Sequence, residues 1–134
     1  MISSQIIKIA SDTTNYGIKK NSNYIATSKN RICGDKITVE LEISNKIIKK
    51  MYYETESCVF CQASASLLSK IIKKKTIKEF LVLADNIKKK KIDPTKKHLP
   101  FKKLFHSKYK ERINCVMLPF DALRKAVFTT KWKN

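Results

Sequence analysis

The feature that most constrains the fold is a change in hydrophobic period part-way along the chain. From residue 36 to residue 43 polar and apolar residues alternate, as in a β-strand with one buried face. The apolar members of this strand are Ile37, Val39, Leu41 and Ile43. From Ser57 onward, small and apolar residues instead recur at helical spacing. Strands followed by helices predict an α+β fold, with the helices packed on one face of an antiparallel sheet.

The rest of the sheet is predicted from shorter patterns. Residues 23–28 are expected to form a strand because β-branched and aromatic residues nearly alternate there. Residues 47–53 form the return strand after a hairpin turn at residues 44–46. The result is a small sheet of about three strands. With 134 residues, the chain is expected to form a single domain over residues 1–134.

Helices are expected on both sides of these strands. Residues 1–16 form a short helix or an arm, and Ser57 is a favourable N-cap for the helix after it. A second helix spans residues 76–88, and residues 92–100 form a linker. Beyond the linker, a short helix is marked by Phe101, Leu104 and Phe105.

The last helix contains a proline, which affects where it begins. Pro119 suits a first helical turn and not a helix interior, because proline has no N–H to donate. The helix is therefore expected to begin near Leu118 and to leave Cys115 on the preceding loop.

The net charge of the chain limits the kinds of partner that it is expected to bind. Its 29 basic and 11 acidic side chains give a net charge of +18, which favours an anionic partner. Apart from Arg31, Arg112 and Arg124 every basic residue is lysine, and lysine runs are typical of a solvated surface. A functional anion-binding face is the alternative, and nucleic acid is disfavoured. No apolar run approaches the ~18 residues of a membrane span and no signal pattern stands out, so we expect a cytoplasmic protein without a membrane partner.

Cysteine and aspartate supply the candidate chemistry. Without a secretion signal, four cysteines favour metal or sulfur chemistry over disulfides. Cys33 and Asp35 flank Gly34 in a turn between two strands, where a thiolate and a carboxylate could bind one metal ion. Cys58 precedes a helix, whose N-terminus favours a thiolate. Together with Cys115 these residues make a ligand set for zinc or for an iron–sulfur cluster.

Other residues near these positions leave alternatives open. Cys61 is either half of a Cys-x-x-Cys pair or a small buried residue. Arg112 could hold an anion, lower the pKa of Cys115 or form a surface salt bridge. His98 and His106 could supply nitrogen ligands, although exposed linker positions suit them better. No zinc-protease, phosphate-loop or serine-hydrolase motif is present, which argues against hydrolase and nucleotide chemistry.

Several segments, taken together and in order, resemble the iron–sulfur cluster assembly scaffolds of the IscU/NifU/SufU type. They are Asn15-Tyr16-Gly17, Asn30 to Ile37, Ser57-Cys58, Gln62 to Ser66, Arg112 to Cys115, and Ala122-Leu123. Two features resemble the SufU-like branch most. Arg112 lies three residues before the last cysteine, and Asn114 stands where the IscU branch has histidine.

The resemblance implies a SufE/IscU-like fold and a specific site. By position in the family pattern, Cys33, Asp35, Cys58 and Cys115 would bind zinc or a transient [2Fe–2S] cluster. Cys33 or Cys115 would accept persulfide sulfur from a cysteine desulfurase of the SufS/IscS kind, with Arg112 nearby. Sulfur or cluster would pass to a downstream iron–sulfur carrier or apo-protein, so the chain would be a scaffold or transfer partner more than an enzyme. Cys61, where the family has a residue without a thiol, is a possible extra ligand.

Two hypotheses compete with this one. A basic, zinc-stabilised nucleic-acid-binding module would explain the charge, and it rests on the charge alone. A family member that has lost its metal chemistry and serves as an interaction protein is the other.

Overall fold

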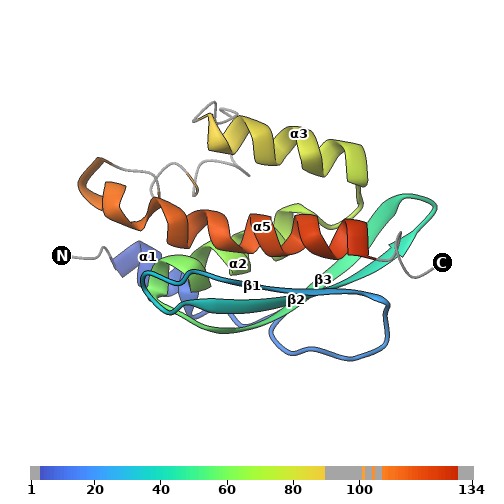
Figure 1. Ribbon diagram of the computed structural model, residues 1–134, viewed down its shortest axis with the longest axis horizontal. Coiled ribbons are helices and arrows are strands. Elements are labelled where there is room, and N and C mark those ends of the chain that lie inside the picture. Colours follow the sequence, from blue (N-terminus) through green and yellow to red (C-terminus); the bar gives the residue numbers. More distant parts are fainter. Residues whose placement is uncertain (1–3, 90–100, 102–103, 105–106, 130–134) are drawn as a thin grey trace.

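The computed structural model describes residues 4–89, 101, 104 and 107–129, and its centre is an antiparallel sheet with helices on one face (Figure 1). The sheet has four strands in the order β1-β2-β3-β4. They are β1 Tyr24–Lys29, β2 Lys36–Ser44, β3 Ile47–Glu56 and β4 Lys75–Thr76. The expected α+β class is confirmed, and the expected strand count is one too low. The strand β4 has only two residues, too few to produce a period-2 pattern.

The hairpin of β2 and β3 matches the alternating pattern. Ile37, Val39 and Leu41 are fully buried, as predicted. The turn places Asn45 and Lys46 at φ 52° and 62°, which matches the twist of a tight hairpin. The return strand runs past its expected end at residue 53 and continues to residue 56, so it carries the chain to the residue pair Ser57-Cys58.

The helices form the rest of the core. They are α1 Ser4–Ala10, α2 Val59–Ile71, α3 Ile77–Lys88, the 3-10 helix η1 Ser107–Arg112, and α5 Ile113–Thr129. Helices α2 and α5 pack on the sheet, α1 packs on α2, and α3 contacts α5 on the side away from the strands (Figure 1). The largest fully buried side chains include Phe80, Phe101 and Phe120. Within the described residues, no helix has the length and hydrophobicity needed to cross a bilayer.

Two helix starts differ from expectation. The N-cap of α2 is Cys58 and not Ser57, and the Cys58 side chain makes no capping hydrogen bond. The helix α5 begins at Ile113, so Pro119 lies inside it and Cys115 lies in its first turn instead of on a loop. Pro119 cannot donate to the Cys115 carbonyl, but the next carbonyl, that of Val116, accepts a 2.6 Å bond from Ser64 Oγ on α2. Packing on α2 thus supports the helix across the proline.

The segment between α1 and β1 is anchored at Asn15 and Gly17. The Gly17 N–H donates to the Tyr53 carbonyl at 2.8 Å, and the Tyr53 N–H donates to the Asn15 carbonyl at 3.3 Å. The Asn15 amide also donates to Ser69 Oγ on α2 at 3.0 Å. Gly17 has φ +118°, a conformation that favours glycine. The expected helix within residues 1–16 is present as α1, and the segment after it is bonded to both the sheet and α2.

The remaining expectations are met in part. The helix α3 begins one residue after the expected start, behind a capping box formed by Thr76 and Glu79. Phe101 and Leu104 are helical and buried, as expected of a short helix there. The linker at residues 92–100 with His98, and the residues Phe105 and His106, lie outside the described residues.

Candidate metal centre

The loop between β1 and β2 is shaped by Asn30. Its N–H donates to the Asp35 carbonyl, and its carbonyl accepts from the Gly34 N–H, both at 2.8 Å. Its side-chain Oδ1 accepts the Ile32 N–H at 3.0 Å. Gly34 takes φ +78°, which closes the turn and brings Cys33 and Asp35 to one end of the sheet. The sequence interpretation gave Asn30 no role of its own, although an asparagine opening a glycine-containing turn is a recognised signal.

Three of the four predicted ligands meet at this end of the sheet. The ligand atoms of Cys33, Asp35 and Cys115 all lie within 4.8 Å of one another. The two sulfur atoms are 3.7 Å apart. The first two residues come from the loop and the third from the first turn of α5. The start of α5 is held by η1, whose Tyr109 ring packs on Phe60 of α2 with the ring centroids 4.8 Å apart. Two separate elements therefore place the cluster.

The Asp35 carboxylate is only half satisfied. The residue is 6% exposed, and its Oδ1 accepts the Cys58 N–H at 3.2 Å. Its Oδ2 is buried and has no hydrogen-bond partner within the described part of the chain. A buried carboxylate oxygen without a donor is unfavourable, and a cation beside it would satisfy it. Two thiols and a carboxylate are donors that zinc and iron accept, so the residues present fit a metal ion.

The fourth predicted ligand, Cys58, lies beside this group. It is partly buried at the N-terminus of α2, and its sulfur is not within the 4.8 Å group. Burial, and after it the neighbouring Cys58 thiol, raises the pKa of the Cys115 thiol. Cys58 is thus linked to the group by its backbone bond to Asp35 and by the influence of its thiol on the pKa of Cys115.

Cys61 and Arg112 are not members of this group of ligand atoms. Cys61 is fully buried, its Sγ is 3.9 Å from Thr55 Oγ1, and burial raises the pKa of its thiol to about 12. Its environment is that of a small core residue. Arg112 is exposed at the end of η1 and forms no ion pair with any described residue. An anion-binding role for Arg112 stays a prediction.

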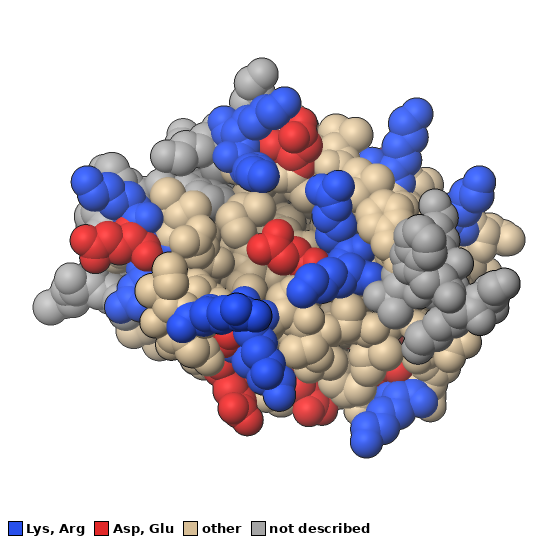
Figure 2. All heavy atoms as spheres, viewed as in Figure 1, with Lys and Arg blue, Asp and Glu red and all other residues tan. Residues whose placement is uncertain are grey.

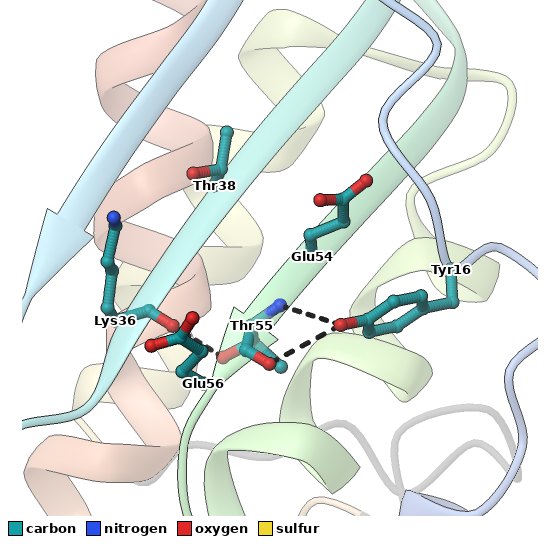
Figure 3. Close-up of a pocket in the computed structure, with 6 residues that line it drawn as sticks. All are labelled: Tyr16, Lys36, Thr38, Glu54, Thr55 and Glu56. Atoms are coloured by element: carbon teal, nitrogen blue, oxygen red, sulfur yellow. Dashed lines mark hydrogen bonds between the residues drawn. The ribbon is translucent and has the colours of Figure 1, made fainter.

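A separate hollow of about 140 Å³ lies on the outer face of the sheet, and none of the candidate ligands lines it. Figure 3 shows the Tyr16 ring reaching across to the backbone of Thr55, whose N–H and carbonyl both lie 3.4 Å from the Tyr16 hydroxyl. Thr55 Oγ1 in turn donates to the Lys36 carbonyl at 2.6 Å. The residues that line this hollow therefore hold the end of β3 in place, just before Cys58.

Comparison with known proteins assigns the family. The profile of the NifU-like N terminal domain matches residues 1–134. The chain belongs to this family. The resemblance inferred from the motifs is thereby confirmed.

Characterised members of the family cover most of the chain. The zinc-dependent sulfurtransferase SufU of Bacillus subtilis is 30% identical over 112 residues, which cover 80% of this chain and 76% of that protein. The iron–sulfur cluster assembly scaffold protein IscU of Thermotoga maritima is 28% identical over 131 residues, covering 95% and 92%. The identities to the two branches are nearly equal, so the SufU-like assignment stays a prediction.

Solved structures of the family share the fold. The N-terminal NifU-like protein of Brucella abortus superposes with a TM-score of 0.83 at 21% identity, over 98% of this chain and 95% of that one. A SufU-type scaffold from Fervidobacterium islandicum gives a TM-score of 0.78 at 24% identity, over 92% and 93%. These structures agree with the sheet and helix arrangement of Figure 1.

Proposed function

We propose that this chain acts in iron–sulfur cluster assembly and holds a metal centre on Cys33, Asp35, Cys58 and Cys115. The observation that carries the proposal is the clustering of Asp35 with the thiols of Cys33 and Cys115, with its buried Oδ2 lacking a hydrogen-bond partner among the described residues. Family membership supports the same function, because relatives named for zinc-dependent sulfur transfer and for cluster assembly match most of the chain.

The four residues differ in how firmly they would hold a metal. Thiolates are soft ligands that suit zinc and iron, whereas the Asp35 carboxylate is harder and more readily exchanged. Zinc bound here would keep the thiols deprotonated at neutral pH. The Cys58 N–H donates to one oxygen of Asp35, and the other oxygen has no hydrogen-bond partner among the described residues. Asp35 is thus the ligand best suited to open the site during transfer.

Exposure favours Cys33 over Cys115 as the sulfur acceptor. Cys33 is exposed, whereas Cys115 is 3% exposed, so only Cys33 is open to a large partner. Its thiolate would attack the terminal sulfur of a persulfide on a SufS/IscS-like cysteine desulfurase. A new S–S bond forms at Cys33, the donor's S–S bond breaks, and the donor cysteine leaves as a thiolate. Ile32, 91% exposed next to Cys33, offers this partner an apolar contact.

In the scaffold form of the proposal, the same residues assemble a [2Fe–2S] cluster as cargo and pass it to a downstream carrier or apo-protein. A readily exchanged Asp35 ligand would let the site open both in the sulfur-acceptor form and in the scaffold form of the proposal. We therefore expect Asp35→Ala to slow release of zinc or transfer of cluster, measured with a chelator or an apo-acceptor. Unchanged exchange kinetics would contradict this role for Asp35.

The proposal is tested by measuring zinc, iron and acid-labile sulfide in protein purified without oxygen. Stoichiometric zinc without visible absorbance, together with activation of a desulfurase, supports the sulfur acceptor. Iron with sulfide and visible charge-transfer bands supports the scaffold. Cys33→Ala should lower the metal content, while Cys61→Ala, the same change at a buried cysteine outside the cluster, should not. No stoichiometric metal after purification or reconstitution would contradict both forms.

A further inference from the structure

A second hollow lies between β1 and the C-terminal half of α5. Its volume is about 460 Å³, and none of the candidate metal ligands lines it. Its lining consists of Ser28, Lys29, Asp121, Arg124, Lys125 and Phe128. Figure 2 views the molecule from the side of α5, where basic side chains surround an acidic patch over the middle of that helix. The hollow is thus lined by basic side chains and by the aromatic ring of Phe128.

Ser28 supplies an unsatisfied polar group to this hollow. The residue is 3% exposed, and its hydroxyl has no hydrogen-bond partner within the described part of the chain. A buried hydroxyl without a partner is unfavourable, and an acceptor entering the hollow could take its hydrogen bond.

The charges around the hollow favour a carboxylate. Lys29, Arg124 and Lys125 line it against a single acid, Asp121. Burial raises the pKa of Asp121, and the nearby cations Lys88, Lys125 and Arg124 oppose that shift. Asp121 therefore already lies near Arg124 and Lys125, two of the cations that line the hollow.

The strand beside the hollow, β1, is an edge strand of the described sheet. In the described part of the sheet, β1 pairs with β2 and with no other strand. Lys125 Nζ lies 3.5 Å from the Thr27 carbonyl, so this carbonyl points away from β2 and toward α5. In an antiparallel pair the backbone groups of alternate residues point the same way, which gives Ile25 and Lys29 the same orientation as Thr27. Such an edge can pair with an added extended segment.

We propose that this hollow and the β1 edge bind an extended acidic segment of a partner protein. The segment's backbone pairs with β1, and its carboxylates are bound by Lys29, Arg124 and Lys125. The Ser28 hydroxyl donates to an acceptor on the same segment. This surface goes beyond the proposed metal chemistry and needs no metal to operate.

The test is a titration of the full-length, isotope-labelled protein, with its metal content recorded, monitored by amide NMR shifts. The probe is an acetylated Glu-Val-Glu-Val-Glu peptide at physiological salt, and Gln-Val-Gln-Val-Gln is its uncharged counterpart. We expect saturable shifts at Ile25, Thr27 and Lys29 with the acidic peptide alone. Arg124→Gln should weaken binding about fivefold, the effect of one partly exposed ion pair. Lys73→Gln removes the same charge at an exposed turn residue and should leave the affinity unchanged.

A second variant changes the affinity in the opposite direction. Asp121→Asn removes the chain's own competing carboxylate and should tighten binding of the acidic peptide about threefold. Shifts scattered over the lysine-rich surface, or equal weakening by Arg124→Gln and Lys73→Gln, would overturn the proposal in favour of non-specific polyanion binding. Shifts at the hollow from inorganic phosphate but not from the peptide would overturn the peptide as the occupant. None of these outcomes depends on whether the cysteines hold metal.

Discussion

Two buried carboxylates in this molecule have opposite surroundings. Glu40 of β2 is 1% exposed, and Asp35 of the cysteine loop is 6% exposed. Glu40 Oε1 accepts two backbone N–H bonds at 2.7 and 3.0 Å, and its Oε2 accepts two more at 2.8 and 3.0 Å. All four donors belong to residues 19–22. Asp35 has one such donor, on Oδ1, and no partner on Oδ2 among the described residues.

The difference separates a structural carboxylate from one that is ready for a ligand. Glu40 holds residues 19–22 against the outer face of the sheet, and its hydrogen bonds are complete without any added group. Asp35 is also held by hydrogen bonds, from the Asn30 N–H to its backbone carbonyl and from the Cys58 N–H to its Oδ1. Its Oδ2, however, has no partner among the described residues. Burial alone therefore does not distinguish the two acids, and the unfilled acceptor in a group with two thiols is what makes Asp35, and not Glu40, the proposed metal ligand.

The largest expected effect is that of Glu40→Gln. The amide would turn an NH₂ group toward backbone donors and remove the charge that all four bonds share, so we expect a loss of about 3 kcal/mol in unfolding free energy. Urea unfolding of metal-free protein measures it. Glu42→Gln, an exposed change on the same strand, is the control and should stay within about 0.5 kcal/mol. A Glu40→Gln protein as stable as the parent would contradict the structural role assigned to Glu40.

A smaller effect is expected for Asp35→Asn in the same metal-free assay. The amide oxygen can still accept the Cys58 N–H, and Oδ2 has no donor to lose. The unfolding free energy should change by less than about 1 kcal/mol, in contrast to Glu40→Gln. A loss as large as that of Glu40→Gln would mean that Asp35, too, is mainly structural.

The smallest effect concerns a partly exposed carboxylate, Asp12. Its ion pair with Lys70, with help from Thr14, lowers its pKa to about 2. A lowered folded-state pKa stabilises the fold above the unfolded pKa of about 3.9, and this stabilisation disappears as the pH falls toward 2. Exposed pairs contribute little, so Asp12→Asn should reduce stability by less than about 1 kcal/mol at pH 7. The difference from the parent should shrink between about pH 4 and pH 2 in acid-unfolding curves; a difference that is constant over this range would contradict the ion pair.

Local patterns predicted the layers of this fold. The alternation around Val39 gave the central strand, and helical spacing after Ser57 gave the helices on one face. The cysteine pattern, with the family resemblance, indicated Cys33, Asp35 and Cys115, which meet at the end of the sheet, and also Cys58, whose sulfur lies outside that group. Cys33 and Asp35 could be paired from sequence because a single glycine turn joins them.

The features that the sequence did not predict depend on contacts between distant segments. The alternation puts Glu40 on the solvent face, but residues 19–22 fold over it and bury it. Pro119 predicted a late helix start, and the bond from Ser64 to the Val116 carbonyl shows how packing on α2 outweighs that local preference. Helical spacing placed Cys61 with Cys58, yet Cys61 packs into the core. None of these contacts leaves a periodic signal in the sequence.

The central claim, that Asp35 shares a metal with the neighbouring cysteines, is tested most directly by zinc X-ray absorption on the parent protein and on Asp35→Ala. For the parent we predict about three sulfur ligands near 2.3 Å and about one oxygen ligand near 2.0 Å. In Asp35→Ala the oxygen contributed by the carboxylate should be lost or replaced by water, with the sulfur shell retained. An all-sulfur shell that is unchanged by the substitution would contradict the claim and would indicate that Cys61 is a ligand instead.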